Sequence, residues 1–160
     1  MNQEIFTAVR KGDLNQVRML LSQDDVNQLN DLNQSLLHEA ISSRQDEIAL
    51  ALIGKGISLE IQDKEGKTAL SYAAAHQNQA VAKAIVDVGA AIDIPDRYGN
   101  SPLWFAMQSS RADYHLFEML LKAGADPSLK NKVNRSVIDF ANQTNNDVLR
   151  GLIDNAARKN

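Results

Sequence analysis

The chain has 160 residues, of which 44% are hydrophobic and 23% charged, with three prolines and eight glycines. This composition is typical of a folded protein and excludes a disordered or fibrous one, and the length suits one compact domain or one short repeat array. Seventeen basic and twenty acidic side chains leave a net charge of −3, too little to favour a nucleic acid or a membrane surface as a partner. The chain has no cysteine, which excludes disulfides and thiolate chemistry.

The amino-terminal segment, residues 1–13, contains no apolar run that a signal peptide or a membrane-spanning helix would need. We therefore expect a cytoplasmic protein. An amphipathic run from Val17 to Leu21 predicts a helix. The residues after it, 22–25, lack the glycine that ends later runs of this kind, so we expect residues 2–27 to form a degenerate cap.

A short motif recurs along the rest of the chain. Its copies begin at Ser35, Thr68, Ser101 and Ser136, with spacings of 33, 33 and 35 residues. Glycine or asparagine, which tolerate positive φ, stands two residues before each copy, at Asn33, Gly66, Gly99 and Asn134. Serine and threonine are good helix N-caps, and Pro102 fits a first helical turn. Each copy therefore predicts a turn followed by a helix.

A second amphipathic run follows each motif. These runs are 48–53, 81–86, 116–121 and 148–153. Glycines at positions 56, 89 and 124 suit left-handed residues that end three of these helices. Each unit is thus predicted to consist of a turn and two helices.

These features resemble the ankyrin repeat, with its 33-residue period and its Thr-Pro-Leu-His-x-Ala motif. The best matches are the segments 96–103 and 122–127, and the resemblance covers about residues 2–155. It implies an all-α solenoid of about five repeats with degenerate caps at both ends. We expect repeats at residues 2–27, 28–60, 61–93, 94–128 and 129–155, with a tail at 156–160. The motif histidine survives only as His38; Ser71, Trp104 and Asp139 replace it elsewhere.

A turn-helix-helix unit cannot bury its apolar face alone, so the units should stack. A column of small residues should let the paired helices approach closely, and it comprises Ala8, Ala40, Ala73, Ala106 and Ala141. A buried row should comprise Leu37, Leu70, Leu103 and Ile138. We assign both sets to the core.

The turn tips and the outward side of each first helix remain exposed, and solenoids use such a concave surface for recognition. In the resembled family these positions contact the partner. The partner-binding residues predicted on this basis are Asp31, Leu32, Gln34, Ser43, Lys64, Glu65, Lys67, His76, Arg97, Tyr98, Asn100, Trp104, Gln108, Ser109, Lys132 and Arg135.

Three local features bear on this surface. Tyr98 lies on a tip and Trp104 near it, and both residue types are frequent in interface hot spots; the alternative is that Trp104 fills the motif-histidine position as a packing residue. The connection 109–115 is longer than its counterparts. It is either a functional loop or a length change that the fold tolerates. Residues 1–80 carry a net charge of −4, and residues 81–160 carry one of +1. Near the last turn, Lys130, Lys132 and Arg135 form either a weakly basic end that could contact an acidic patch of a partner, or an ordinary solvated face.

No catalytic, cofactor or metal site is predicted. The three histidines fall in different repeats and lack the spacing of a metal motif or a catalytic triad. A hydrolase that uses His76 or His115 with Asp113 or Ser109 is the rival hypothesis. An open concave surface excludes water poorly, which disfavours it.

We therefore expect a non-enzymatic, cofactor-free module, monomeric on its own, that binds another folded protein. Its role would be that of an inhibitor or adaptor. Small stand-alone ankyrin proteins of bacteria include immunity proteins, so the resemblance also allows an antitoxin-like protein that occludes a cognate toxin. A structural spacer with no partner is a third possibility.

Overall fold

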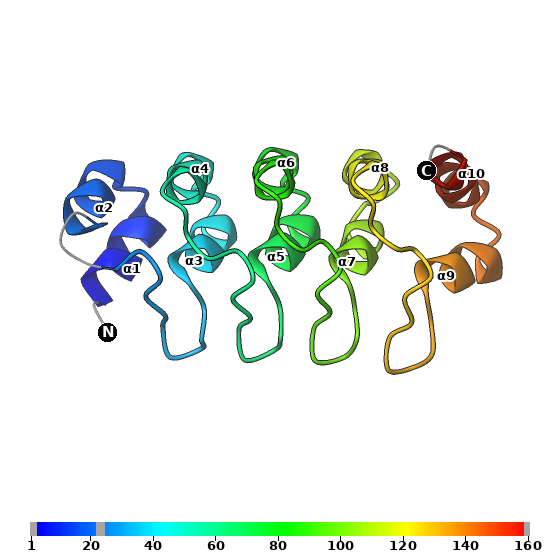
Figure 1. Cartoon of the computed structure of the whole chain (residues 1–160), viewed down its shortest axis with the longest axis horizontal. Coiled ribbons are helices and arrows are strands. Elements are labelled where there is room, and N and C mark those ends of the chain that lie inside the picture. The colour runs from blue at the N-terminus through cyan, green and yellow to red at the C-terminus, as the bar shows by residue number, and fades with distance from the viewer. Residues whose placement is uncertain (1–2, 22–24, 159–160) are drawn as a thin grey trace.

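The computed structural model describes residues 3–21 and 25–158. Within these ranges the chain forms ten helices and no strand beyond an isolated bridge between Leu29 and Ser35. The helices are α1 (Gln3–Lys11), α2 (Leu14–Leu21), α3 (Leu36–Ser42), α4 (Asp46–Gly54), α5 (Ala69–Ala75), α6 (Gln79–Asp87), α7 (Pro102–Gln108), α8 (His115–Lys122), α9 (Val137–Gln143) and α10 (Asp147–Ala157). They form five consecutive pairs (Figure 1).

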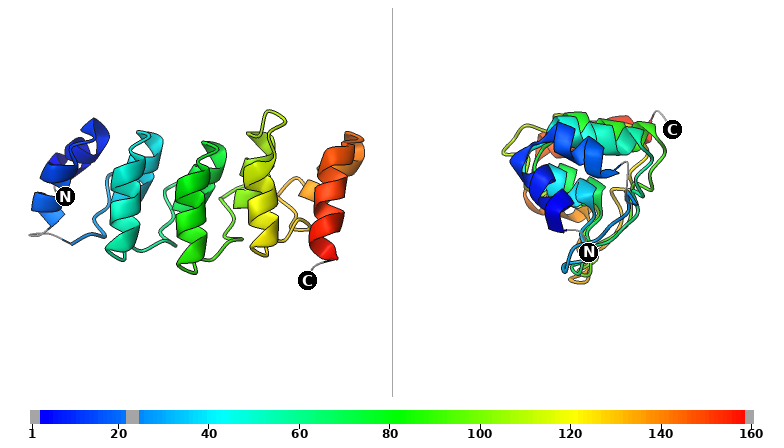
Figure 2. Two further views of the ribbon diagram at one scale, coloured as in Figure 1. Left: turned by 90° about the horizontal axis from the view of Figure 1, so that it is seen from above. Right: turned by 90° about the vertical axis from the view of Figure 1, so that its left-hand side faces the viewer.

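The pairs stack side by side into an elongated array with two helical layers. Odd-numbered helices form an inner layer and even-numbered helices an outer layer (Figure 1). Four long loops extend beyond the inner layer and bring the chain from one pair to the next (Figure 2). The predicted all-α solenoid is confirmed. The repeat boundaries stay a prediction, and the glycine-free stretch 22–24 lies outside the described residues.

Serine or threonine caps set the start of the inner helices after the loops. The hydroxyls of Ser35, Thr68, Ser101 and Ser136 each accept a hydrogen bond from the backbone N–H three residues ahead. Each bond satisfies one of the N–H groups that a helix start leaves unpaired. Pro102 occupies the first turn of α7, where a missing N–H removes no bond.

Left-handed residues end the helices. Gly56, Gly89 and Gly124 follow three outer helices with φ values of 78°, 86° and 98°, as predicted. The connections from inner to outer helices use the same conformation at Gly12, but also at Arg44 and Gln77, where the residue type gives no such indication. The connection between α7 and α8 spans 109–114, against two or three residues between the helices of the other pairs, and Figure 2 shows it protruding from the array.

The predicted alanine column is buried throughout. Its small side chains allow the inner helices to pack closely against their neighbours and their outer partners. Leu37, Leu70 and Leu103 are also fully buried, but Ile138 is only partly buried. The prediction that Ile138 completes the buried row is therefore wrong, because α9 belongs to the last described pair and no further pair covers that side of it.

Candidate functional site

The four long loops share one hydrogen-bonded turn, which we call the tips: residues 30–34, 63–67, 96–100 and 131–135. Each tip begins with Asn or Asp, whose side-chain oxygen accepts two backbone N–H groups of the same tip. In the second tip, Asp63 Oδ1 accepts from Glu65 at 2.9 Å and from Lys67 at 2.9 Å. Asn30, Asp96 and Asn131 make the corresponding bonds. The tips are therefore closed by their own first residue.

Each tip is also joined to the next by a backbone hydrogen bond. The N–H groups of Lys64, Arg97 and Lys132 donate to the carbonyls of Leu32, Glu65 and Tyr98, at 3.0, 2.8 and 2.8 Å. These bonds require close approach of neighbouring tips. A Cβ on Gly66 would lie 2.7 Å from Arg97 N, and one on Gly99 would lie 2.9 Å from Asn131 Cα. Glycine is thus needed there for space as well as for its positive φ.

The predicted tip residues divide into exposed side chains and side chains held by the fold. Exposed are Asp31, Leu32, Lys64, Arg97, Tyr98 and Lys132. The partly buried ones are Gln34, Glu65, Lys67, Asn100 and Arg135. Three of this second group form side-chain hydrogen bonds: Gln34 to Tyr72, Asn100 with Asp96 and Asn131, and Arg135 to Gln143. They are therefore less available to a partner than the exposed set.

Tyr98 is the most prominent aromatic side chain of the tips and is 49% exposed. The Arg97 guanidinium lies 4.8 Å from the centre of its ring and 2.9 Å from Glu65 Oε1. The pKa of Arg97 is raised by its hydrogen bond to Tyr98, so the group keeps its charge. An exposed ring beside a fixed cation is well suited to an interface.

A row of side chains on the inner helices runs beside the tips and was not predicted from the sequence. This inner-face row comprises Glu39, Tyr72, Phe105 and Phe140, which follow the motif-histidine position in four repeats. Three members are partly exposed aromatic rings. Lys67 Nζ lies 5.4 Å from the Phe105 ring centre and Arg135 Cζ 5.9 Å from that of Phe140. These residues occupy the variable position x of the Thr-Pro-Leu-His-x-Ala motif, and that position is the sequence signal from which the row could have been predicted.

Two members of the inner-face row have fixed polar partners. Glu39 accepts both hydrogen bonds of a bidentate pair from Arg10, at 2.9 and 3.0 Å. Tyr72 donates its hydroxyl proton to Asp63 Oδ2 at 2.8 Å and accepts from Gln34 Nε2 at 2.8 Å. Burial, followed by the bond to Asp63, raises the pKa of Tyr72 to about 12. The phenol therefore stays neutral and links a tip to α5.

Trp104 and His38 occupy the motif-histidine position. Trp104 is partly buried and packs edge-on against Phe140, with ring centres 6.2 Å apart; this is the packing role that the alternative reading gave it. His38 is buried, and its Nε2–H donates to the Lys67 carbonyl at 3.0 Å, while Nδ1 faces the Ser35 N–H at 3.2 Å. Burial lowers the pKa of His38. It is a neutral bridge between repeats.

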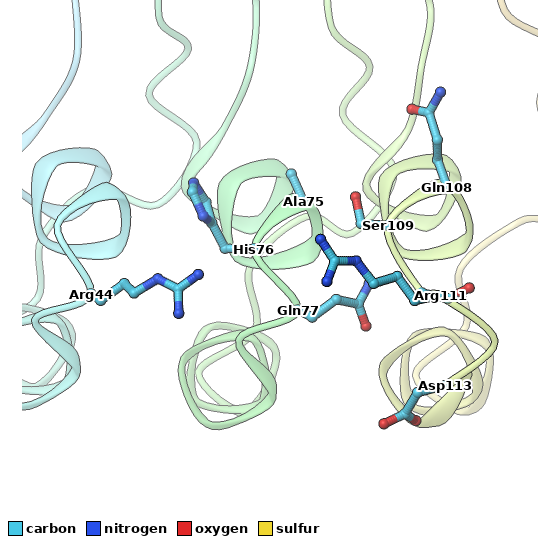
Figure 3. A pocket seen from close by; sticks show the side chains of 9 residues that line it. Arg44, Ala75, His76, Gln77, Gln108, Ser109, Arg111 and Asp113 are labelled. Atoms are coloured by element: carbon cyan, nitrogen blue, oxygen red, sulfur yellow. The ribbon is translucent and has the colours of Figure 1, made fainter.

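The remaining predicted residues, Ser43, His76, Gln108 and Ser109, lie at the far ends of inner helices from the tips. His76, Gln108 and Ser109 line a cavity of about 560 Å³. The other residues that line it were not predicted to bind a partner, and they are Arg44, Ala75, Gln77, Ser110, Arg111 and Asp113. Figure 3 shows this end groove between α3, α5 and α7. Ser43 does not line it; its hydroxyl donates to Glu39 Oε1 at 3.0 Å.

The side chains considered above for a hydrolase do not form a hydrogen-bonded catalytic group. His76, Ser109 and Asp113 line the same groove, but within residues 3–21 and 25–158 no hydrogen bond joins His76 to Ser109 or Asp113. Asp113 instead pairs with His115, on the exposed surface; the bond to Asp113 raises the pKa of His115. Among the described residues no three His, Asp or Glu side chains are grouped to hold a metal ion. Nor does that part of the chain contain a helix of the length and apolarity needed to cross a bilayer.

The sequence of the chain was compared with models of known protein families. A family model described as ankyrin repeats, in three copies, matches residues 52–131, which is half of the chain. The matched segment contains α5 to α8 with the second and third tips. No curated protein matches the chain.

Proposed function

The chain belongs to the ankyrin repeat family, whose repeats are protein–protein interaction modules, and on that premise we propose that it is a non-enzymatic module that binds a folded protein through its tips and inner-face row. The predicted partner-binding residues of the tips belong to this surface, with Arg97 and Tyr98 at its centre, and Trp104 lies beside it. The other four, Ser43, His76, Gln108 and Ser109, lie at the far ends of the inner helices and would contact the partner there. The proposed module needs no cofactor and works in the cytoplasm as a monomer.

One observation carries the proposal: partly exposed aromatic rings stand in register beside a line of rigid tips. The rings at positions 72, 105 and 140 occupy the same place in three consecutive repeats, and Tyr98 is exposed on the third tip. Hydrogen bonds within and between the tips hold the backbone before any partner arrives. A preorganised surface with aromatic anchors loses little conformational entropy on binding.

The test is capture of a partner from a lysate of the native host, followed by hydrogen exchange on the purified complex. Slowed exchange should fall on the tips and inner helices, in an interface of about 1,600 Å². The double variant Arg97→Ala/Tyr98→Ala should weaken binding at least tenfold, since truncating a hot spot costs about 2 kcal/mol or more. Val88→Ala, on an exposed apolar residue after an outer helix, is the control. Protection confined to the outer helices would refute the proposal.

The finer roles are separated by the activity of the captured partner. An inhibitor or an antitoxin-like immunity protein must suppress that activity on binding, whereas an adaptor must leave it intact. Titrating the partner's activity with this protein, and with the Arg97→Ala/Tyr98→Ala variant as control, decides between them.

A further inference from the structure

Two arginines face each other across the end groove. Arg44 belongs to the connection after α3, and Arg111 belongs to the longer connection after α7. Figure 3 shows the Arg44 side chain extending toward His76 and Gln77, while that of Arg111 extends the opposite way, toward Gln77 and Ser109. Both guanidinium groups therefore point at the same end of α5, from opposite sides.

Neither guanidinium has a partner within the part of the chain that the structure describes. The acidic side chains that line a pocket together with either arginine are paired with other residues. Asp113, which lines the groove, pairs with His115. Asp46, beside Arg44, accepts a hydrogen bond from Asn78 at 2.6 Å. Arg44 and Arg111 are both exposed, and two positive charges that face the same groove attract an anion more strongly than one surface charge does.

The floor of the groove between the two arginines is ordered. Gln77 Nε2 donates to the Ala106 carbonyl at 2.9 Å and to the Ala74 carbonyl at 3.2 Å. These bonds tie the end of α5 to α7 and leave the carboxamide oxygen of Gln77 without a donor among the described residues. His76 stacks on the Tyr72 ring, with ring centres 6.4 Å apart. His76 therefore contacts both the groove and one member of the inner-face row.

The backbone at both arginines is unusual. Arg44 has a φ of 57° and Arg111 one of 46°, in the left-handed region that disfavours residues with a Cβ. The end repeats place Gly12 and Asn145 at the position of Arg44, and these residue types adopt this conformation with less strain. Gln77 adopts the same conformation at the position that matches Arg44, so the backbone does not require an arginine there.

From this geometry we infer that Arg44 and Arg111 form a clamp for two carboxylates on an acidic segment of the partner protein. Guanidinium groups bind carboxylates through two parallel N–H···O bonds, which gives orientation as well as affinity. A nucleic acid fits less well, because it requires an extended basic stripe, whereas this chain has a net charge of −3 and acidic residues on three of its tips. The inference rests on the proposed function and specifies one contact within it.

The test uses a synthetic peptide, Gly-Glu-Gly-Gly-Glu-Gly, and the same peptide with glutamine in place of glutamate. The arginine Nε–Hε signals of Arg44 and Arg111 should shift saturably with the glutamate peptide and stay unchanged with the glutamine peptide. In the variant Arg44→Gln/Arg111→Gln the affinity for the glutamate peptide should fall at least tenfold. Glutamine is chosen because Gln77 already adopts positive φ at the position that matches Arg44, and because Arg111 lies in an exposed connection, so the variant should fold. Arg18→Gln/Lys55→Gln removes the same charge from exposed positions outside the groove and should bind like the parent.

Three results would overturn the clamp: unshifted arginine signals, equal weakening by the two double variants, or tighter binding of a decathymidine oligonucleotide than of the glutamate peptide. The captured partner separates this failure from that of the proposed function. If Arg97→Ala/Tyr98→Ala abolishes capture while Arg44→Gln/Arg111→Gln leaves it unchanged, the clamp is refuted and the binding module stands. If neither variant reduces capture, both are refuted.

Discussion

Replacing Gly99 by alanine should destabilise the array more than the same replacement at Gly89. Both glycines have positive φ, 81° and 86°, so both variants incur the left-handed cost of about 1–2 kcal/mol. A Cβ on Gly89 meets nothing within 4 Å, whereas one on Gly99 lies 2.9 Å from Asn131 Cα and 3.1 Å from Lys132 N. Relieving that contact separates the two tips and loses the Lys132 to Tyr98 backbone bond, worth about 1 kcal/mol. The expected losses are thus about 2–3 kcal/mol for Gly99→Ala and about 1–2 kcal/mol for Gly89→Ala.

The assay is urea unfolding followed by far-ultraviolet circular dichroism. Gly54→Ala completes the series, because Gly54 ends α4 with no positive φ and an open site for a Cβ. It should leave stability unchanged or raise it by up to about 1 kcal/mol, since alanine is the better helix former. Equal losses at Gly99 and Gly89 would show that the close approach of the tips contributes nothing, and the argument from packing would fail.

Three further predictions concern the core and its titration. Ala73→Leu should cost about 1–3 kcal/mol by overpacking the buried alanine column; an unchanged thermal midpoint would contradict that register. Leu103→Ala should cost about 2–5 kcal/mol, and Ile138→Ala clearly less because Ile138 is only partly buried, a contrast that paired urea titrations measure. Burial lowers the pKa of His38 in the folded chain, so the unfolded chain takes up the proton more readily, and stability should fall as the pH drops below about 6.5. Urea midpoints at pH 7.5 and 5.5 should show this loss in His115→Ala but not in His38→Gln, and a loss of the same size in both would refute it.

The parts of the fold that could be predicted are those in which a residue type itself favours the local backbone conformation. The N-caps and the tip residues with positive φ, such as Ser101 and Gly99, follow from residue types at fixed spacing. Arg44 and Arg111 were not predictable as left-handed residues, because nothing in an arginine side chain favours that conformation. The partial exposure of Ile138 was missed for another reason: its residue type fits the buried row, and only its place in the last described pair leaves one side of it open.

The candidate site was predicted less completely than the fold. The tips were placed correctly on the exposed surface, since any unpaired loop between stacked units must face solvent. The inner-face row of Tyr72, Phe105 and Phe140 was not predicted, because aromatic residues at these positions of an amphipathic helix are equally typical of a buried core. The end groove depends on three connections from three different repeats, and its arginines converge only after stacking. Such a site has no signature in a contiguous stretch of sequence.

Because each tip is closed by its own first residue, the residues that determine the shape of a tip differ from those whose side chains it exposes. Asp96 and the backbone hold the third tip together, so the side chains of Arg97 and Tyr98 contribute little to the shape they stand on. Substitutions at such positions can therefore change which molecule is recognised without first passing through a misfolded intermediate. A scaffold of this kind can follow a rapidly evolving target, one tip at a time, while its architecture stays constant.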